Sequence, residues 1–490
     1  MAAALLALLS LPHAVGAHSF GTVYSLPIPF WIYAYGASAA LIVSFALVGY
    51  FVNAGSAEKN FATRDLSGNS LADAWVAPRC IALLRVLSVA GLMLTIATGL
   101  FGARNAFSNF SMTFFWIAFA LGFTYVTALI GDLYASINPF AALCAAGERL
   151  YAGAFRARVP YAQFLGYWPA VALYFVYIWI ELFGHSQPRS LAYTLIAYTA
   201  LNLGAAAVFG KEIWFRYGEF FAVFLRVIAL MAPIEYGSTP DGRRRVILRQ
   251  PFIGLLRQPA DRSSLLVFVL FMLSSTAFDG AHETLPWVNI FWRHVWPLIQ
   301  GLVKQQSAHP YVAAVQLFYV WQWGTLALSP FIYLVVYWIF IALTKRVTGS
   351  ALSRRELALR FAFMLVPIAF VYNITHYYTL LLTQGPSLAK LIFDPFGFGW
   401  NVFGSREWVV AGFIPSAGAV WHTQVWLILL GHIVSVYLSH LQALRLFPSK
   451  AAAARSQIPL LFLMVLFTTV GLWILSLPIA TSQVIVPPPQ

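Results

Sequence analysis

Charged residues are scarce in this 490-residue sequence: Asp, Glu, Lys and Arg together make up only 9% of it, whereas 60% is hydrophobic. A soluble domain needs roughly a quarter of its residues charged to cover its surface. The shortage therefore excludes a soluble globular protein and indicates that lipid is the main solvent of the chain. The formal net charge of +14 does not indicate a nucleic-acid binder, because Lys and Arg fall between apolar runs instead of gathering with aromatics on a soluble domain.

Cysteine and the common catalytic motifs are also nearly absent. Only Cys80 and Cys144 are present, which excludes a disulfide scaffold and a cysteine metal cluster. The sequence contains no Gly-rich loop ending in Gly-Lys-Ser/Thr, no His-Glu-x-x-His and no Gly-x-Ser-x-Gly, so the usual nucleotide, zinc-protease and serine-hydrolase signatures are missing. No two histidines are three or four residues apart. Any metal ion would therefore need ligands from different helices.

Long apolar runs dominate what is present. About twenty apolar residues are needed to cross the core of a bilayer, and ten runs qualify, of which the sixth is short. We therefore predict an all-α fold, a polytopic integral membrane helical bundle that forms a single domain from residue 18 to residue 490. The predicted spans are residues 31–52, 81–102, 111–131, 165–183, 190–209, 264–278, 322–343, 357–382, 418–440 and 458–478.

Residues 211–234 break the pattern, because charged residues interrupt the apolar ones at helical spacing. Glu212, Arg216, Glu219 and Arg226 fall mainly on one side of a helix, which predicts an amphipathic helix lying in the cytoplasmic interface. A basic cluster follows it. This cluster is interpreted either as a plain topology signal or as a binding site for anionic lipid, and its members are Arg243, Arg244, Arg245, Arg249, Arg257 and Arg262.

The N-terminus carries a short apolar run, Ala2 to Leu11, followed by the small residues Val15-Gly16-Ala17. This pattern predicts a secretory signal peptide over residues 1–17, although its first residues lack Lys and Arg. The alternative is an uncleaved anchor. Cleavage would make His18 the first residue of the mature chain, and its amine and imidazole could together bind a metal such as copper.

The distribution of Lys and Arg predicts the orientation of the bundle. With ten spans and an external N-terminus, the cytoplasmic loops carry 22 of these residues and the external loops carry 6. Such a bias is the positive-inside signal. We therefore predict a bacterial inner-membrane protein with both mature termini outside the cytoplasm.

Ionisable side chains inside the predicted spans are the candidates for a functional site, because burying them in lipid is costly. His376, His432 and Asp279 lie on three different spans, in the outer half or near the midplane. We predict that these three form the catalytic site and, with His18, the ligands of a metal ion. The alternative is that each histidine is a packing residue bonded to a nearby carbonyl or tyrosine. Further polar groups at the same depth are Glu181, His185, His282 and His422.

Short motifs along most of the chain resemble a family of bacterial multi-span membrane proteins labelled fenitrothion hydrolase. The resemblance implies hydrolysis of organophosphorus triesters, and it brings no catalytic residue with it. The motifs are Leu26-Pro27-Ile28-Pro29, Gly131-Asp132, Asn138-Pro139-Phe140, Trp168-Pro169-Ala170, Trp179-Ile180-Glu181, Gly218-Glu219-Phe220, Phe278-Asp279-Gly280, Val366-Pro367-Ile368, His376-Tyr377, Asp394-Pro395-Phe396, Gly431-His432 and Gly471-Leu472-Trp473.

Three functions are compatible with these observations. The first is a membrane-embedded hydrolase that collects an apolar phosphotriester from the bilayer and uses a divalent transition metal or a His/Asp base to activate water. The second is a transporter or permease whose outer cavity uses the same polar residues. The third is a copper-handling membrane protein. The expected partners are the lipid bilayer and an apolar small molecule, with no nucleic acid, and the sequence leaves homo- and hetero-oligomers open.

Overall fold

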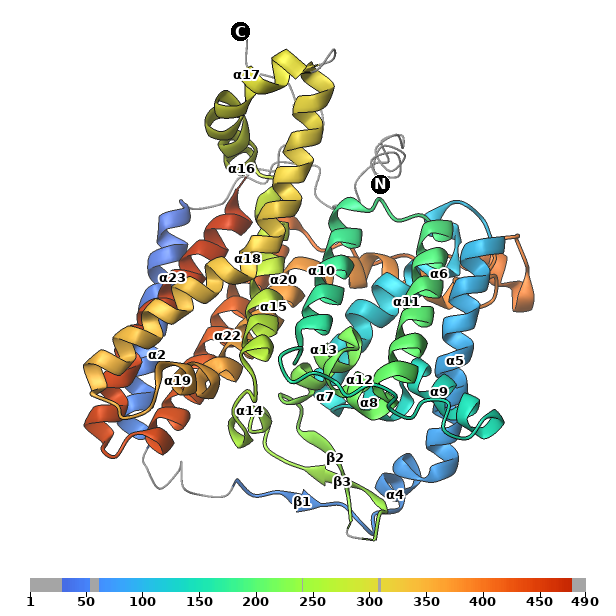
Figure 1. The fold of residues 1–490 in the computed structure, drawn as a ribbon, viewed down its shortest axis with the longest axis horizontal. Helices are drawn as coiled ribbons and strands as arrows, with labels where there is room; N and C mark the ends of the chain where they lie inside the picture. Colours follow the sequence, from blue (N-terminus) through green and yellow to red (C-terminus); the bar gives the residue numbers. More distant parts are fainter. Residues whose placement is uncertain (1–28, 53–60, 240, 307–309, 478–490) are drawn as a thin grey trace.

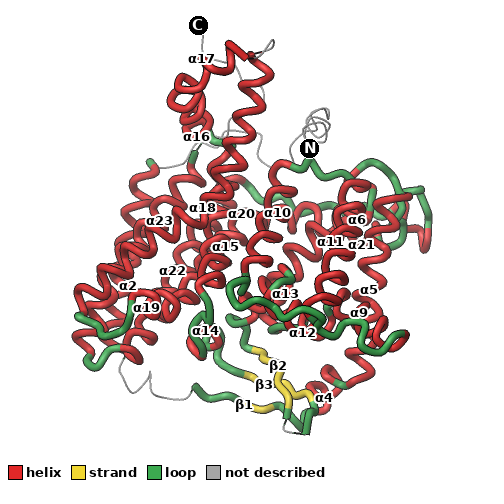
Figure 2. The backbone as a smooth tube through the Cα atoms, in the orientation of Figure 1, coloured by secondary structure: helices red, strands yellow, loops and turns green. Residues whose placement is uncertain are grey.

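The computed structural model describes residues 29–52, 61–239, 241–306 and 310–477 (Figure 1). Most of this part is helical, and the few strands gather at one end of the molecule (Figure 2). The prediction of an all-α membrane bundle is therefore confirmed. The predicted signal peptide at residues 1–17 and His18 lie outside the described residues, so both stay predictions.

Nine helical stretches within the described residues are long and apolar enough to span a bilayer. Each overlaps one of the predicted spans. They are α2 (Phe30–Phe51), α5 (Pro78–Phe101), the run of α6 (Phe110–Met112), η2 (Thr113–Phe123) and α7 (Thr124–Ile130), α11 (Pro188–Phe209), α15 (Ser263–His282), α18 (Pro310–Thr348), the run of α19 (Arg354–Phe361), η4 (Ala362–Leu365), α20 (Val366–Gln384), η5 (Gly385–Ser387) and α21 (Leu388–Leu391), α22 (Ala417–Leu446), and α23 (Lys450–Ser476).

The predicted span over residues 165–183 is the shorter apolar helix α10 (Trp168–Phe183), which has 16 residues and is about 24 Å long. The segment that precedes α10 in the sequence and the segment that follows it lie at opposite ends of the bundle. Gly131, just after α7, lies against the carbonyl of Ile234 at the start of the sheet, whereas Pro188 at the start of α11 lies against Gly99 near the far end of α5. The chain must therefore cross between them, and α10 provides the path (Figure 1).

The spans differ in how far the protein covers them. Within the most apolar 18-residue stretch of each helix, the buried share is 83% in α15, 17% in α2 and 11% in α5. The middle of α15 consists of large apolar side chains that are almost inaccessible, including Phe268, Leu270 and Phe271. The sixth predicted span is therefore not marginal: it is longer than expected and forms the centre of the bundle, while α2 and α5 present apolar side chains at the rim.

A small antiparallel sheet marks one end of the bundle, which we call the sheet end (Figure 1). Its strands are β1 (Arg64–Asp65), β2 (Ile234–Ser238) and β3 (Arg244–Leu248), in the order β1-β3-β2. The all-helical prediction did not include it. Other short helices connect the spans. They include α4 (Ser70–Val76), η1 (Ala106–Ser108), α8 (Tyr134–Ile137), α9 (Pro139–Leu150), α14 (Gly254–Arg257) and η6 (Val402–Glu407).

The predicted interfacial helix over residues 211–234 is two helices, α12 (Lys211–Tyr217) and α13 (Phe220–Ala229). The break lies at Gly218-Glu219. A Cβ at Gly218 would come within 2.4 Å of the Trp214 ring, and the Glu219 side chain caps the first turn of α13. Most of α13 is buried in the main core. Of the charges that suggested a surface helix, Glu219 is thus a cap and Arg226 donates to the carbonyl of Arg216, whereas Glu212 is exposed.

The opposite end of the bundle carries a projection that we call the satellite (Figure 1). It consists of α16 (Leu285–Ile290), the π-helix η3 (Phe291–Val295), α17 (Trp296–Gln306) and the first turns of α18. A separate apolar cluster of Phe291, Trp292 and Phe318 holds it together. With 39 residues, α18 is about 58 Å long, nearly twice the thickness of a bilayer core, so the satellite extends beyond the spans.

Candidate functional site

Asp279 and His376 form the centre of the candidate site. Asp279 lies one turn before the end of α15, and His376 lies on α20, which packs against it. The His376 Nε2 atom is 2.7 Å from Asp279 Oδ2, and the Asp279 side chain is only 2% exposed. A buried carboxylate needs an oppositely charged or hydrogen-bonded partner, and the histidine provides it. The structure thus brings together two of the three predicted site residues.

Tyr377 and Glu181 extend this pair into a line of four polar side chains. The Tyr377 hydroxyl donates to Asp279 Oδ2 at 2.6 Å and also hydrogen-bonds Glu181 on α10. A tyrosine hydroxyl can donate one hydrogen bond and accept another, so Tyr377 can link the two carboxyl groups. We call Glu181, Tyr377, Asp279 and His376 the polar array. It crosses three helices, α10, α20 and α15.

His282 closes the end of α15 next to the array. Its Nδ1 atom is 2.8 Å from the carbonyl of Asp279 and 3.9 Å from Asp279 Oδ1. Its ring stacks on Phe278 and is almost fully buried. Asp279 Oδ1 itself has no hydrogen-bond partner among the described residues. One oxygen of this carboxylate therefore holds two partners, while the other remains able to accept a water or a proton.

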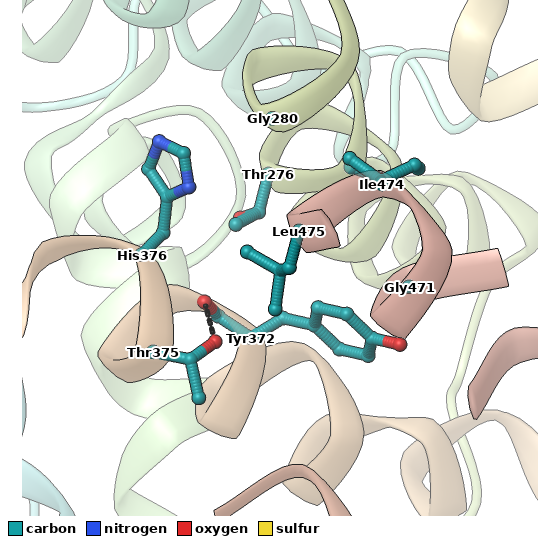
Figure 3. Close-up of a pocket in the computed structure, with 9 residues that line it drawn as sticks. Thr276, Gly280, Tyr372, Thr375, His376, Gly471, Ile474 and Leu475 are labelled. Carbon is teal, nitrogen blue, oxygen red and sulfur yellow. Dashed lines mark hydrogen bonds between the residues drawn. The ribbon is translucent and has the colours of Figure 1, made fainter. Parts of the chain in front are cut away.

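Two small cavities lie at the two ends of the polar array. One, of about 10 Å³, is lined by His376, Thr375 and Tyr372 together with residues of α15 and α23 (Figure 3). The other, of about 20 Å³, is lined by Glu181 and Tyr377. Thr276 lines both. Such volumes hold about one water molecule each, so each end of the array faces a site for water.

The glycines around the first cavity explain how the helices approach so closely. At Gly471 on α23, a Cβ would lie 1.6 Å from the Tyr372 hydroxyl. At Gly280, a Cβ would lie 2.9 Å from Ile474, also on α23, and 4.0 Å from the His376 ring. Small residues let helix backbones come together, and here they let α15, α20 and α23 meet around His376.

A π-helix forms part of the wall of the second cavity. Residues 113–123 of the third span form η2, which packs against α20, and Ala120 and Leu121 from it line the cavity beside Glu181. π-Helical segments are rare and often occur at functional sites. The wider turn therefore belongs to the same region as the polar array.

His432, the third predicted site residue, does not join this group. Its ring is fully buried, Nδ1 is 2.8 Å from the carbonyl of Ile428, and the Tyr372 ring is 6.1 Å away. Among the residues that the structure describes, no three His, Cys, Asp or Glu side chains are grouped to hold a metal ion. The expected convergence of three ligands is therefore not found there, because His432 faces Tyr372 instead of Asp279.

The other polar residues expected at this depth divide into two groups. Glu181 and His282 belong to the site, whereas His185 and His422 are exposed. Tyr377 and Thr276 were not among the candidate site residues predicted from the sequence. The position of Tyr377 beside His376 in the sequence was a signal, but consecutive helical residues point in different directions, so its contact with Asp279 required the structure.

Five of the six arginines in the basic cluster have structural partners. Arg244 donates to the Ser136 hydroxyl at 2.8 Å, and Arg245 pairs with Asp65 on β1 at 2.7 Å. Arg249 donates to the carbonyls of Ala229 and Ala232 at the end of α13 and pairs with Glu235 at 3.0 Å. Burial lowers the pKa of Arg249, and the Glu235 carboxylate opposes this shift. Arg257 also pairs with Glu235, and Arg262 lies over the Tyr217 ring. Anionic lipid binding stays a prediction for the exposed members of the cluster.

Comparisons of the chain with protein-family models, with curated proteins and with solved structures return no match. The resemblance to the fenitrothion hydrolase family therefore stays a prediction. The function has to be inferred from the geometry of the polar array and its surroundings.

Proposed function

We propose that this membrane protein is a proton-coupled transporter, in which the polar array carries and senses the proton. The observation that supports the proposal is the line from Glu181 to His376, which has a water-sized cavity at each end. Chains of carboxylates and histidines inside spans are how membrane pumps and transporters relay protons. Most of the surrounding bundle is apolar, so protons have few alternative carriers at this depth.

The array supplies both a transfer step and a switch. A proton passes from Glu181 to Asp279 when the Tyr377 hydroxyl gives its own proton to Asp279 and accepts the one from Glu181. Asp279 then becomes neutral and Glu181 becomes ionised. A neutral Asp279 no longer attracts His376, so the contact between α15 and α20 weakens. Arrival of a proton thereby favours a second arrangement of these helices, which is how a protonation event shifts a conformational equilibrium.

A hydrolase is the second candidate, because a His–Asp pair beside a water-sized cavity is also the arrangement of a general base. In that mechanism His376 removes a proton from the water, and Asp279 orients the ring. The resemblance implies an organophosphorus triester as the substrate. Both cavities are far smaller than typical small-molecule sites of about 300 Å³ or more, so a triester would require an opening that transport would also use.

Reconstituted liposomes distinguish the two candidates. The protein is placed in vesicles with an internal pH-sensitive dye, a pH gradient is imposed, and valinomycin with potassium balances the charge. We expect proton flux above that of empty vesicles, and loss of this flux in His376→Gln. His422→Gln, at an exposed histidine, is the matched control. Wild-type flux equal to that of empty vesicles would contradict the proposal, and nitrophenol release from a triester without flux would favour the hydrolase.

A further inference from the structure

A line of buried polar side chains runs along one face of α22 toward the sheet end. It consists of His432, Ser435, Ser439 and His440, all at most 3% exposed. Steps of three, seven and eight residues from His432 place them on the same side of a helix. Apolar residues such as Leu438 and Leu441 fill positions between and after them. The helix therefore has a polar seam inside a lipid-embedded bundle.

Several atoms of this seam make no hydrogen bond with the described part of the chain. They are His432 Nε2 and Ser439 Oγ, and Gln457 on the adjoining α23 adds its Oε1. His432 Nδ1 donates to the carbonyl of Ile428, which leaves its Nε2 as an acceptor. A buried polar group without a partner destabilises the fold, and ordered water is the usual way in which native proteins satisfy such groups.

The seam starts next to the cavity beside His376. Tyr372 lines that cavity, and its ring lies 6.1 Å from the ring of His432. The backbones of α20 and α22 are close at this level, since a Cβ on Gly431 would be 2.3 Å from a methyl group of Val371. His432 is therefore the first group of the seam that water leaving the cavity would meet.

The seam ends among polar groups near the sheet end. The Gln457 Nε2 atom is 2.8 Å from His440 Nδ1 and 3.1 Å from the carbonyl of Ala453. If the Gln457 Nε2 atom donates to His440 Nδ1, the neutral His440 ring carries its proton on its own Nε2 atom. The carbonyl of Val52, just after α2, also interacts with this ring. His440 thus lies where α22, α23 and the end of α2 come together.

We infer that the seam from His432 through Ser439 to His440 and Gln457 is a hydrated path that carries protons between the polar array and the sheet end. The inference rests on the proposed function, and it gives that function the second half of its route. The array accounts for proton transfer only in the half of the bundle nearest the satellite. Water bound to the unsatisfied atoms supplies the donors and acceptors that the remaining half requires.

Cysteine accessibility tests the hydration of the path without relying on transport. In a background with Cys80→Ala and Cys144→Ala, the full chain in vesicles carries Ser439→Cys, and 2-aminoethyl methanethiosulfonate is the probe. Two controls lie next to it on α22: Leu438→Cys in the apolar core and Tyr437→Cys at the lipid-facing surface. We expect Ser439→Cys to react at least about tenfold faster than both, because water promotes thiolate formation. Reaction no faster than at Leu438→Cys would overturn the path.

Flux measurements separate failure of the path from failure of the transporter. We expect Ser439→Val and His432→Leu to lose most of the proton flux, and His432→Gln, which still binds water, to keep more of it. If the wild type conducts protons and the first two variants conduct equally well, the path is wrong while the proposed function stands. If the wild type does not conduct but Ser439→Cys is accessible, the proposed function fails and the hydrated path remains.

Discussion

Two buried carboxylates in this bundle have opposite surroundings. Glu219 is completely inaccessible and accepts four hydrogen bonds, from the Tyr198 hydroxyl, the Asn138 amide and the backbone N–H groups of Phe221 and Ala222. Asp279 is almost as buried, but one of its oxygens has no hydrogen-bond partner within the described chain.

The difference separates a structural carboxylate from a functional one. Every acceptor site of Glu219 is directed at a fixed donor, which holds the start of α13 in place. Asp279 also accepts from a tyrosine, but its other partner is His376, whose ring can gain or lose a proton, and water-sized cavities adjoin the array. Burial alone thus does not identify a functional carboxylate. A functional carboxylate is distinguished here by a partner that can itself gain or lose a proton and by cavities that can hold water next to it.

The largest expected effect is on transport, at Asp279. Asn at this position can still accept from His376 and Tyr377 through its carbonyl oxygen, so the fold should persist. It cannot take up a proton, and we expect proton flux in vesicles to fall by at least about tenfold, equivalent to about 1.4 kcal/mol of barrier. Thermal unfolding in detergent serves as the control. Asp279→Asn with wild-type flux would remove Asp279 from the proton route.

The corresponding change at Glu219 should affect stability instead of transport. In Glu219→Gln, an NH₂ group would face donors that now bind a carboxylate oxygen, and two donors opposed in a buried site cost about 1–3 kcal/mol. We expect a lower unfolding temperature in detergent, with normal flux per folded molecule. Unchanged stability together with lost flux would reverse the roles assigned to the two carboxylates.

A smaller effect is expected where the helices pack around the array. Gly471→Ala would place a methyl group 1.6 Å from the present position of the Tyr372 hydroxyl, so Tyr372 must move and lose its bond to the carbonyl of Phe467. Overpacking of this kind costs about 1–3 kcal/mol. We expect a lower unfolding temperature and a partial loss of flux. Gly204→Ala, at a helical glycine with open space around it, is the control and should change neither.

The sequence was sufficient to predict the bundle, because a span needs only a long apolar run, and ten runs were present. It also predicted the shared depth of Glu181, Asp279 and His376, since the charge bias fixes the direction of each span. It could not predict which way each helix is turned. His432 has a suitable depth, but it faces Tyr372, and only the packing of α20 against α22 determines that.

The elements that sequence reasoning missed depend on contacts between distant segments. β1 pairs with β3, so that Arg64 lies opposite Leu248, and such a two-residue strand has no periodic signal of its own. The charges in residues 211–234 suggested a surface helix, whereas Glu219 is buried because Tyr198 and Asn138 reach it from α11 and the start of α9. Their partners could not be identified from spacing.

A matched pair of Tyr→Phe variants tests the central claim most directly. Tyr377 donates to Asp279 and Tyr198 donates to Glu219. Each change therefore removes one hydroxyl donor to one buried carboxylate. Proton flux into vesicles under an imposed pH gradient is measured for both variants and the wild type. The account predicts that Tyr377→Phe loses most of its flux, because the array is interrupted, while Tyr198→Phe conducts like the wild type. Equal flux in the two variants would contradict it.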